Sequence, residues 1–577
     1  MYDLIIQNGL LYDGTGADAY RADIGIVGDR IVRIGNLQGE AAAQVIDADG
    51  KAVTPGFIDP HSHADLSILT HPSMEAYLMQ GVTTVVGGNC GHSMGPIGSE
   101  IYRSAIIDFP LTFAAEPKYF DLVSLLLPKE AAARAWRDLY GMELDWHSFG
   151  DYIEACNRHG MDANIVPLVG YSAVRNAVMG ADCMREATPE ELDRLAQVVE
   201  ESMAAGAFGL STGLDPQYVP GPYATDEETI QMLKIVRTHD GIFTSHTFNV
   251  GPDGSGGRME GYQKMLTQAK AAGVRANVSH VHLLGMAATP EDAIKAAQNT
   301  IAYFEQMQQA GLDLSYDVIP TADAIDFTIP YFAFFLRPFV LMSGSRAHLA
   351  ENFRVGDFRQ MVRTVLQNGM YPALDPNQPL NYYGMLSITR HTDAACLGKT
   401  FSALAAERGV DPLELMMDLF AQDPDMAVGM GSAGFTAAND LLCRHPMAMP
   451  CSDGFSCTKD TNLTANAELP LYPNPMNLSF IPRFLLRASH PRFEDTVRQA
   501  SGFVAERFGI RDRGVLREGA FADIVVLDRS QLRCYDEAEN ALQYPDGFEH
   551  VIVNGVPTIA HKRHLGARAG RMLRKTD

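Results

Sequence analysis

The chain has 577 residues, 46% of them hydrophobic, so it is long enough for more than one compact unit with a large core. This hydrophobic content excludes a disordered protein. Its 70 acidic residues outnumber its 46 basic residues and give a formal net charge of -24. Such a charge repels nucleic-acid phosphates and anionic lipid surfaces, so we expect neither nucleic acid nor a membrane as a partner.

The sequence shows no pattern of a targeting or membrane-spanning segment. The N-terminal "MYDLIIQNGLLYDG" lacks the basic and hydrophobic regions of a secretory signal, and the eight cysteines form no regular framework. The most apolar segment, residues 328–342, is too short to span a bilayer and contains Arg337 and Pro338. We therefore expect a cytoplasmic protein without a transmembrane helix. The basic segment 561–575 is expected to be a solvated end.

The two ends of the chain share a strand-rich pattern. Residues 2–48 and 514–559 alternate polar and β-branched residues around Asp-Gly and Asn-Gly pairs, which is typical of hairpins. We expect residues 1–51 and 501–577 to form one small β-sandwich, with the catalytic unit, residues 52–500, inserted between them.

The middle of the chain alternates short apolar strands with helical patterns, as in repeated βα units. "TPEELDRLAQVVEESMAAG" is one such helix, with Thr188 as its N-cap and Glu191 three residues later. The pattern predicts an α/β fold, a TIM-like (β/α)8 barrel with functional residues at the strand C-termini. Two insertions are expected, at about 97–147 and at 319–445, the second being a cap between barrel strands 7 and 8. The eight candidate strands are 52–61, 82–88, 164–170, 207–212, 241–246, 275–280, 312–318 and 446–453.

Residues with metal-ligand character fall at the ends of these strands. His61 and His63 in "DPHSHAD" are two residues apart at the end of the first strand, so both rings point to one side. Imidazoles that face one point suit a divalent metal such as zinc. His246, His280 and Asp453 close strands 5, 6 and 8, and five such residues at equivalent ends indicate a metal centre. Asp59 is expected to orient a ligand or to cap the strand.

Asp453 is the candidate general acid/base, because a carboxylate beside metal-bound hydroxide can carry its proton to a leaving group. A second metal needs a bridging ligand, and no lysine lies at a strand end to serve as one. Cys90 in "VVGGNCGHSMG" ends strand 2 and can coordinate or bridge as a thiolate. For a cysteine beside an apolar strand, packing is the ordinary alternative. Its position favours the metal-ligand interpretation.

These motifs resemble the N-acyl-D-amino-acid deacylases (D-aminoacylases) of the amidohydrolase superfamily. The resemblance runs nearly end to end through "PGFIDPHSHAD", "GVTTVVGGNCGHSMGP", "GAFGLSTGL", "SHTF", "VSH", "SDG", "DRGVLREGAFADIVVLD" and "HVIVNGVP". It implies a TIM-like barrel with a small β-sandwich that binds one or two Zn2+ ions. It also implies the two ligand sets, His61, His63 and Asp453 around one metal and Cys90, His246 and His280 around the other.

The sequence departs from this family around the pocket rather than in the metal set. Tyr171 stands where the family usually has histidine after strand 3, although Arg175 is retained. His282 replaces the usual lysine after strand 6 and is either a partner of the metal ligands or a substrate contact. The aromatic run "PYFAFFLRPF" is either an apolar lid over an acyl or aryl group of the substrate, or a subunit interface or the core of the cap. His92 has no assigned role. The expected substrate-binding residues are Arg175, Tyr171, Tyr218, Tyr223, His282 and Arg483, for each of which ordinary packing is the alternative.

Together these features predict a zinc-dependent hydrolase of a non-peptide C–N amide bond in a small molecule. The expected substrates are N-acyl (D-)amino acids, with other N-acyl amines, aryl amides or cyclic amides as the alternative. A non-catalytic scaffold with the same fold is a remote alternative, because every ligand position is present. A homo-oligomer is compatible with the sequence.

Overall fold

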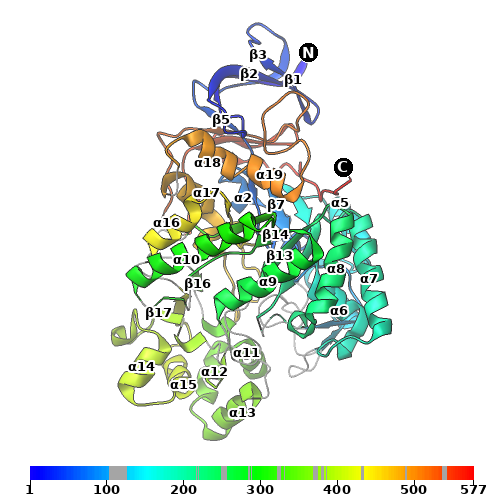
Figure 1. Cartoon of the computed structure of the whole chain (residues 1–577). Helices are drawn as coiled ribbons and strands as arrows, with labels where there is room; N and C mark the ends of the chain where they lie inside the picture. The colour runs from blue at the N-terminus through cyan, green and yellow to red at the C-terminus, as the bar shows by residue number, and fades with distance from the viewer. Residues whose placement is uncertain are drawn as a thin grey trace.

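The computed structural model shows a barrel that lies between a β-rich end and a helical cap (Figure 1). None of its described helices is long and apolar enough to cross a membrane. The structure describes the chain except residues 103–125, 216–217, 219, 248–256, 284–285, 288, 321–326, 330–331, 368–373, 378–381, 385, 431–434, 465, 488–489, 536–541 and 577.

Parallel strands follow one another around the barrel in the order of the chain. They form a three-stranded sheet, β10-β7-β6, and a six-stranded sheet, β11-β12-β13-β14-β15-β19, in which β10 and β11 are one strand interrupted at Leu168. Each of the eight predicted strands corresponds to one of these positions. The strands are β6 (Phe57–Asp59), β7 (Val82–Gly87), β10 (Asn164–Pro167), β11 (Val169–Gly170), β12 (Gly209–Gly213), β13 (Ile242–His246), β14 (Arg275–Val278), β15 (Leu314–Val318) and β19 (Ala448–Pro450).

The first and last strands of the barrel meet just beyond their C-terminal ends. Ser62 and Gly454 form a parallel bridge. The backbone N–H of His63 donates to the Gly454 carbonyl at 2.6 Å, and that of Asp453 donates to the His61 carbonyl at 3.0 Å. These bonds bring the residues after β6 and β19 together, and the predicted (β/α)8 architecture is confirmed.

Helices pack against the barrel through one apolar face, and several of them begin at a Ser or Thr whose side chain caps the first turn. In α7 the Thr188 hydroxyl accepts a hydrogen bond from the backbone N–H of Glu191. In return, the Glu191 carboxylate accepts one from the backbone N–H of Thr188. This reciprocal pair confirms the predicted N-cap. The helices outside the cap are α1 (Ala64–Ser67), α2 (Glu75–Leu78), α5 (Phe149–His159), α6 (Tyr171–Met179), α7 (Pro189–Ala204), α8 (Asp226–Thr238), α9 (Arg258–Ala272), α10 (Pro290–Gln309), α16 (Thr436–Arg444), α17 (Pro475–Arg487), α18 (Phe493–Gln499) and α19 (Gly502–Phe508), with the 3-10 helices η1 (Gly180–Asp182) and η3 (Gly221–Tyr223).

Strands from both chain ends form one nine-stranded sheet, in which β20 pairs with β5 in antiparallel register. The two ends therefore share one β unit, although the exact domain bounds stay a prediction. The basic C-terminal segment does not remain solvated as expected, because Met572 and Leu573 are buried and Met572 bridges to Ile165 of β10. The strands are β1 (Tyr2–Leu11), β2 (Tyr20–Val27), β3 (Arg30–Gly35), β4 (Ala42–Asp47), β5 (Ala52–Pro55), β20 (Ile524–Leu527), β21 (Phe548–Val553), β22 (Val556–Ala560) and β23 (Arg563–His564).

The long connection between β15 and β19 forms a cap with its own hydrophobic core. Phe332 and Phe339 of the aromatic run are buried in this core, which favours the cap-core interpretation of that run. The cap elements are β16 (Phe327–Ile329), η4 (Phe332–Phe334), α11 (Arg337–Ser343), α12 (Arg346–Asn352), α13 (Gly356–Gln367), η6 (Tyr382–Gly384), β17 (Leu386–Arg390), η7 (Ala394–Cys396), α14 (Phe401–Arg408), α15 (Pro412–Gln422) and β18 (Ala427–Met430). The shorter insertion contains β8 (Glu100–Tyr102), β9 (Leu126–Pro128) and α4 (Lys129–Tyr140).

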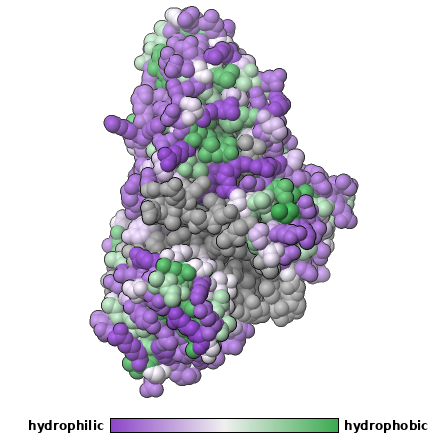
Figure 2. Space-filling model, turned by 90° about the vertical axis from the view of Figure 1, so that its left-hand side faces the viewer, coloured by the Kyte–Doolittle hydropathy of each residue, from purple (hydrophilic) through white to green (hydrophobic). Residues whose placement is uncertain are grey.

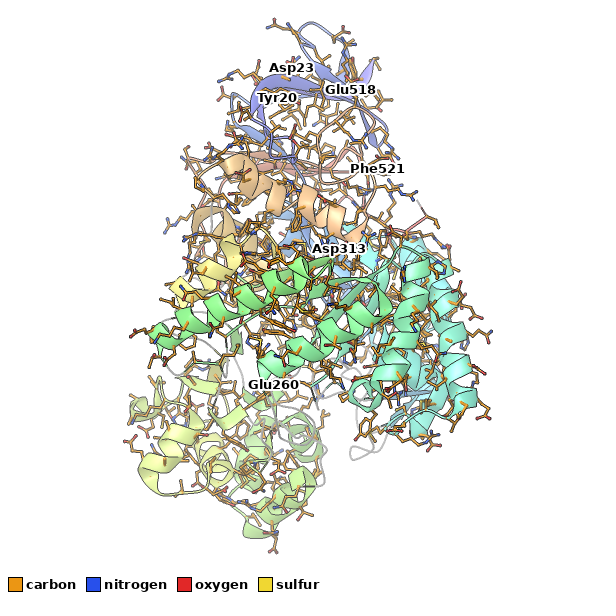
Figure 3. The ribbon with its side chains drawn as sticks, viewed as in Figure 1. Tyr20, Asp23, Glu260, Asp313, Glu518 and Phe521 are labelled. Carbon is orange, nitrogen blue, oxygen red and sulfur yellow. The ribbon has the colours of Figure 1, made fainter. Side chains whose placement is uncertain are left out.

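Two labelled residues show the direction of the barrel (Figure 3). Asp313, directly before β15, lies on the side of the β-rich end, whereas Glu260, in the first turn of α9, lies on the side of the cap. The strand C-termini and the N-termini of the following helices therefore face the cap. This is the edge at which a (β/α)8 barrel carries its functional residues.

The surface turned to the viewer in Figure 2 is mainly hydrophilic. Outside the grey atoms, hydrophobic side chains gather there in small groups separated by hydrophilic residues. This pattern agrees with the polar, acidic surface that the composition indicates.

Candidate metal centre

His61 and His63 follow β6 directly and are both buried. The Nε2 atoms of His61 and His63 lie 3.4 Å and 3.2 Å from the same atom, Oδ1 of Asp453. Asp59 accepts hydrogen bonds from the backbone N–H groups of His61 and Ser452 at 3.1 Å and 3.2 Å, so it joins the ends of β6 and β19. Burial raises the pKa of Asp59 to about 7, against the hydrogen bonds that it accepts. Asp59 thus orients the ligand-bearing segments, as expected.

Cys90 lies where the chain turns after β7, and its sulfur faces three imidazoles. The distances from Sγ are 3.4 Å to His61 Nε2, 3.8 Å to His246 Nδ1 and 3.6 Å to His280 Nε2. Burial alone would raise the pKa of the Cys90 thiol, but the charge of His61 and the hydrogen bonds from His246 and His280 hold it well below its usual value. The site therefore favours a thiolate, the form in which cysteine binds metals.

The backbone at three of these positions is left-handed, which is uncommon for residues other than glycine. Cys90, His280 and Asp453 have φ values of 55°, 31° and 53°. Gly88 makes the turn before Cys90 possible, because its φ is 80° and a Cβ there would lie 2.0 Å from the Leu168 carbonyl oxygen. Sparsely populated backbone conformations of this kind cluster at functional sites.

His246 and His280 complete the group at the ends of β13 and β14. His246 Nδ1 lies 2.7 Å from His280 Nε2, and the other ring nitrogen of His246 lies 3.0 Å from Asp215 Oδ2. This second contact fixes the orientation of the ring, as carboxylates do behind metal-binding histidines. All six predicted ligands therefore converge at one edge of the barrel.

Asp453 is the most open member of the group, since 32% of its side chain is exposed, against 7% for His63 and none for His61. Burial would raise the pKa of Asp453, but the hydrogen bonds from His61 and His63 hold it well below its usual value. Its carboxylate is thus charged at neutral pH and partly exposed at the barrel edge.

The donor set fits one or two zinc ions. Two ligand atoms of one tetrahedral zinc, each about 2.0–2.3 Å from the ion, lie roughly 3.3–3.8 Å apart. The separations around Cys90, 3.4–3.8 Å, and around Asp453, 3.2–3.4 Å, agree with this, whereas the 2.7 Å between His246 Nδ1 and His280 Nε2 is shorter than two ligands of one ion require. Within the part of the chain that the structure describes, two groups could hold an ion: His61 with His63 and Asp453, and His61 with Cys90 and His280. The first is the predicted set, whereas in the second His61 stands in place of His246.

Two carboxylates behind these ligands were not found by sequence reasoning. Asp215 follows β12 directly, and Asp317 lies within β15, one residue before its end. Asp317 Oδ1 lies 3.3 Å from His61 Nδ1 and accepts from the backbone N–H of His280 at 2.5 Å. Both residues lie at or just after the C-terminal end of a predicted strand, and this position is the sequence signal by which they could have been found.

Replacing Asp317 with asparagine is expected to weaken metal binding about 10- to 100-fold, because outer-shell carboxylates fix the orientation and basicity of ligating histidines. Competition with a chromophoric chelator measures the affinity. Asp313→Asn is the matched control, since Asp313 precedes the same strand at its other end and 60% of its side chain is exposed. Equal affinities for D317N and D313N would contradict the role of Asp317.

Tyr218 and Tyr223 differ in their distance from the ligands. The Tyr218 ring is buried against His246, with a centroid distance of 4.1 Å, whereas Tyr223 in η3 is 42% exposed. His92 also contacts Tyr218, at 5.6 Å between ring centroids, and burial lowers the pKa of His92 to about 3. His92 is therefore a neutral ring beside the centre. Substrate contacts by the two tyrosines stay predictions.

Tyr171 and Arg175 project from α6 toward a carboxylate within the fold. The Tyr171 hydroxyl donates to Glu228 Oε1 at 2.6 Å, and the Arg175 guanidinium forms an ion pair with the same oxygen. Arg175 also donates to the carbonyls of Cys183 and Arg185. Both side chains and Glu228 are buried, so this geometry is that of a structural ion pair. Contact of Tyr171 or Arg175 with substrate is untested and stays a prediction.

Replacing Glu228 with glutamine is expected to lower the free energy of unfolding by about 3 kcal/mol, because it leaves the buried Arg175 charge without its partner. Urea denaturation followed by circular dichroism measures the change. Glu227→Gln, at the exposed neighbouring position on α8, is the control and should unfold like the parent. If E228Q is as stable as E227Q, the ion pair does not stabilise the fold.

The last two predicted contacts lie on α17 and beyond β14. Arg483 is fully buried, and its Nη1 lies 3.1 Å from the Met476 sulfur. The His282 ring lies 6.1 Å from that of His280, nearly parallel to it. Burial holds the pKa of His282 well below its usual value, and the charge of Arg258 adds to the effect. His282 is thus next to the ligand group, and its role as ligand partner or substrate contact stays open.

A (β/α)8 barrel with histidines, a cysteine and an aspartate converging at its C-terminal edge defines the class of metal-dependent hydrolases. The chain belongs to the amidohydrolase family, whose profile matches residues 44–370. It is similar to the D-aminoacylase of Alcaligenes xylosoxydans xylosoxydans, with 27% identity over 588 residues, 100% of this chain and 98% of the relative. It is a metal-dependent amide hydrolase.

Solved structures share the same architecture over the full length. A D-aminoacylase crystal structure aligns with a TM-score of 0.69 at 25% identity and covers 100% of both chains. The N-acyl-D-glutamate deacylase from Bordetella bronchiseptica, solved with zinc and a phosphonate inhibitor, aligns with a TM-score of 0.69 at 23% identity over 99% of both chains. The resemblance to N-acyl-D-amino-acid deacylases inferred from the motifs is thus confirmed.

Proposed function

We propose that this protein hydrolyses N-acyl-D-amino acids to a carboxylate and a free D-amino acid. The observation that carries the proposal is the convergence of Asp453, the one open acidic side chain of the group, with five buried metal donors at the barrel edge. The full-length similarity to D-aminoacylases supports the substrate class.

The residues that would hold the metals are His61, His63 and Asp453 on one side and Cys90, His246 and His280 on the other. When bound, zinc would polarise the amide carbonyl and lower the pKa of water into the neutral range. Asp453 accepts the proton of the attacking water and delivers it to the leaving nitrogen as the C–N bond breaks. Asp215 and Asp317 keep the imidazoles oriented throughout.

A substrate screen with added zinc tests the proposal. N-acyl-D-amino acids, their L-enantiomers, aryl amides and cyclic amides are compared at equal concentration, with release of the free amine as the measurement. We expect turnover of the D-amino acid derivatives, and loss of that turnover after treatment with a chelator. Turnover of only aryl or cyclic amides would assign the alternative substrate class, and no turnover of any amide would overturn the enzymatic proposal.

A further inference from the structure

Arg258 is a buried cation that forms no ion pair with any residue the structure describes, and it lies at the edge of the barrel that carries the metal centre. It is the first residue of α9, whose N-terminal turn faces the cap, as the neighbouring Glu260 shows in Figure 3. The side chain is only 4% exposed, and none of its three guanidinium nitrogens bonds to a carboxylate or carbonyl of the described residues; its polar neighbour is the Tyr262 hydroxyl, one turn along α9. A buried guanidinium left in this state is costly for the folded protein.

The surroundings of Arg258 place it close to the metal ligands. It lies beside His282, whose ring is 6.1 Å from that of the ligand His280. One turn further along α9, the Tyr262 hydroxyl is buried between Arg258 and the backbone of His282. Arg258 and Tyr262 therefore offer several hydrogen-bond donors beside His282.

These donors fit a planar anion such as a carboxylate. A guanidinium binds a carboxylate through two parallel N–H···O bonds, and a neighbouring hydroxyl adds a third donor. The substrate class proposed above carries a carboxylate on the carbon next to the scissile amide nitrogen. An amide carbonyl held at the metal ligands leaves this carboxylate a few bonds away, at the same edge of the barrel as Arg258.

We propose that Arg258 is the residue that binds the α-carboxylate of the substrate, with the Tyr262 hydroxyl as a further donor. This inference rests on the proposed function and makes Arg258 a specificity residue. It assigns the recognition of the substrate's charge to a residue outside every motif discussed above. The enzyme would therefore prefer an N-acyl amino acid to the same compound with its carboxylate converted to an amide.

Arg258→Gln is tested with an N-acetyl-D-amino acid that the parent hydrolyses and with the α-carboxamide of the same compound. We expect KM for the acid to rise about 100-fold in R258Q, because charged hydrogen bonds are lost, while the parameters for the carboxamide stay as in the parent. Arg258→Lys keeps the positive charge but not the planar guanidinium, so its KM for the acid should lie between those of the parent and R258Q. R258K also provides the test if R258Q does not fold.

Thermal unfolding separates binding from a structural role. The melting temperature of ligand-free R258Q should equal or exceed that of the parent, since an unpaired buried charge is removed. The product D-amino acid should raise the melting temperature of the parent but not that of R258Q. Lys264→Gln, at a partly exposed site on the same helix, is the control and should leave all these quantities unchanged.

Each outcome has a separate meaning. If R258Q and R258K retain the parent's preference for the acid, or if the parent shows no such preference, Arg258 does not bind the carboxylate and the proposed hydrolase function stands. A lower melting temperature of R258Q with an unchanged preference assigns Arg258 a structural role and also overturns the inference. If the parent hydrolyses no N-acyl amino acid, the proposed function fails, and the inference fails with it.

Discussion

Asp453→Asn is expected to lower kcat about 1,000-fold, because asparagine can neither accept the proton of the attacking water nor return it to the leaving nitrogen. Asp453 Oδ1 lies within 3.2–3.4 Å of the Nε2 atoms of both His63 and His61, and its side chain is the open one of the group. The amide oxygen of asparagine occupies nearly the same position, so the loss should fall on kcat more than on KM.

Steady-state kinetics with the best substrate of the screen measure this effect, together with the metal content of each purified variant. Asp460→Asn is the matched control, since Asp460 lies in the same connection, is 78% exposed and pairs with Lys459. D460N should retain the parent's kcat. Hydrolysis by D453N at the parent's rate, with the same metal content, would rule out Asp453 as the general acid/base.

The sequence predicts the metal ligands well because their positions follow from local rules. The alternation of short buried strands with helices indicates parallel strands, and parallel strands place their C-terminal residues at one edge. Cys90, His246, His280 and Asp453 each stand at such an end, so their convergence follows once the strands are recognised. The closest approaches, such as 3.4 Å between Cys90 Sγ and His61 Nε2, realise this expectation.

The supporting residues are harder to predict, because their roles depend on contacts between distant segments. Arg175 and Glu228 are 53 residues apart, and nothing local to "GYSAVR" shows that its arginine meets a buried carboxylate. Asp317 follows an apolar run, and an aspartate there is equally compatible with a strand-end turn. A one-dimensional pattern shows where a side chain leaves the backbone but not which group it meets.

The same limit applies to Arg258 and to the C-terminal segment. Arg258 carries no motif, and its burial without an ion pair among the described residues is visible only in the structure. The C-terminal segment is basic, which indicated solvation, yet Met572 and Leu573 pack against the barrel between polar neighbours. The burial of these two side chains removes nonpolar surface from water, and backbone hydrogen bonds such as that from Leu573 N–H to the Ile165 carbonyl, at 2.8 Å, hold the segment against the barrel as well.

Cys90→Ala is expected to weaken metal binding by more than about 100-fold, because even outer-shell partners of metal ligands are worth 10- to 100-fold in affinity. The sulfur of Cys90 lies within 3.8 Å of His61, His246 and His280, so its removal leaves three imidazoles around an apolar methyl group. Deacylation should fall with the metal content and recover only in part at high zinc concentration. Cys443→Ala is the matched control, because Cys443 is equally buried but lies on α16 with Asn439 as its partner. C443A should bind zinc like the parent, whereas full metal content in C90A would show that Cys90 only packs.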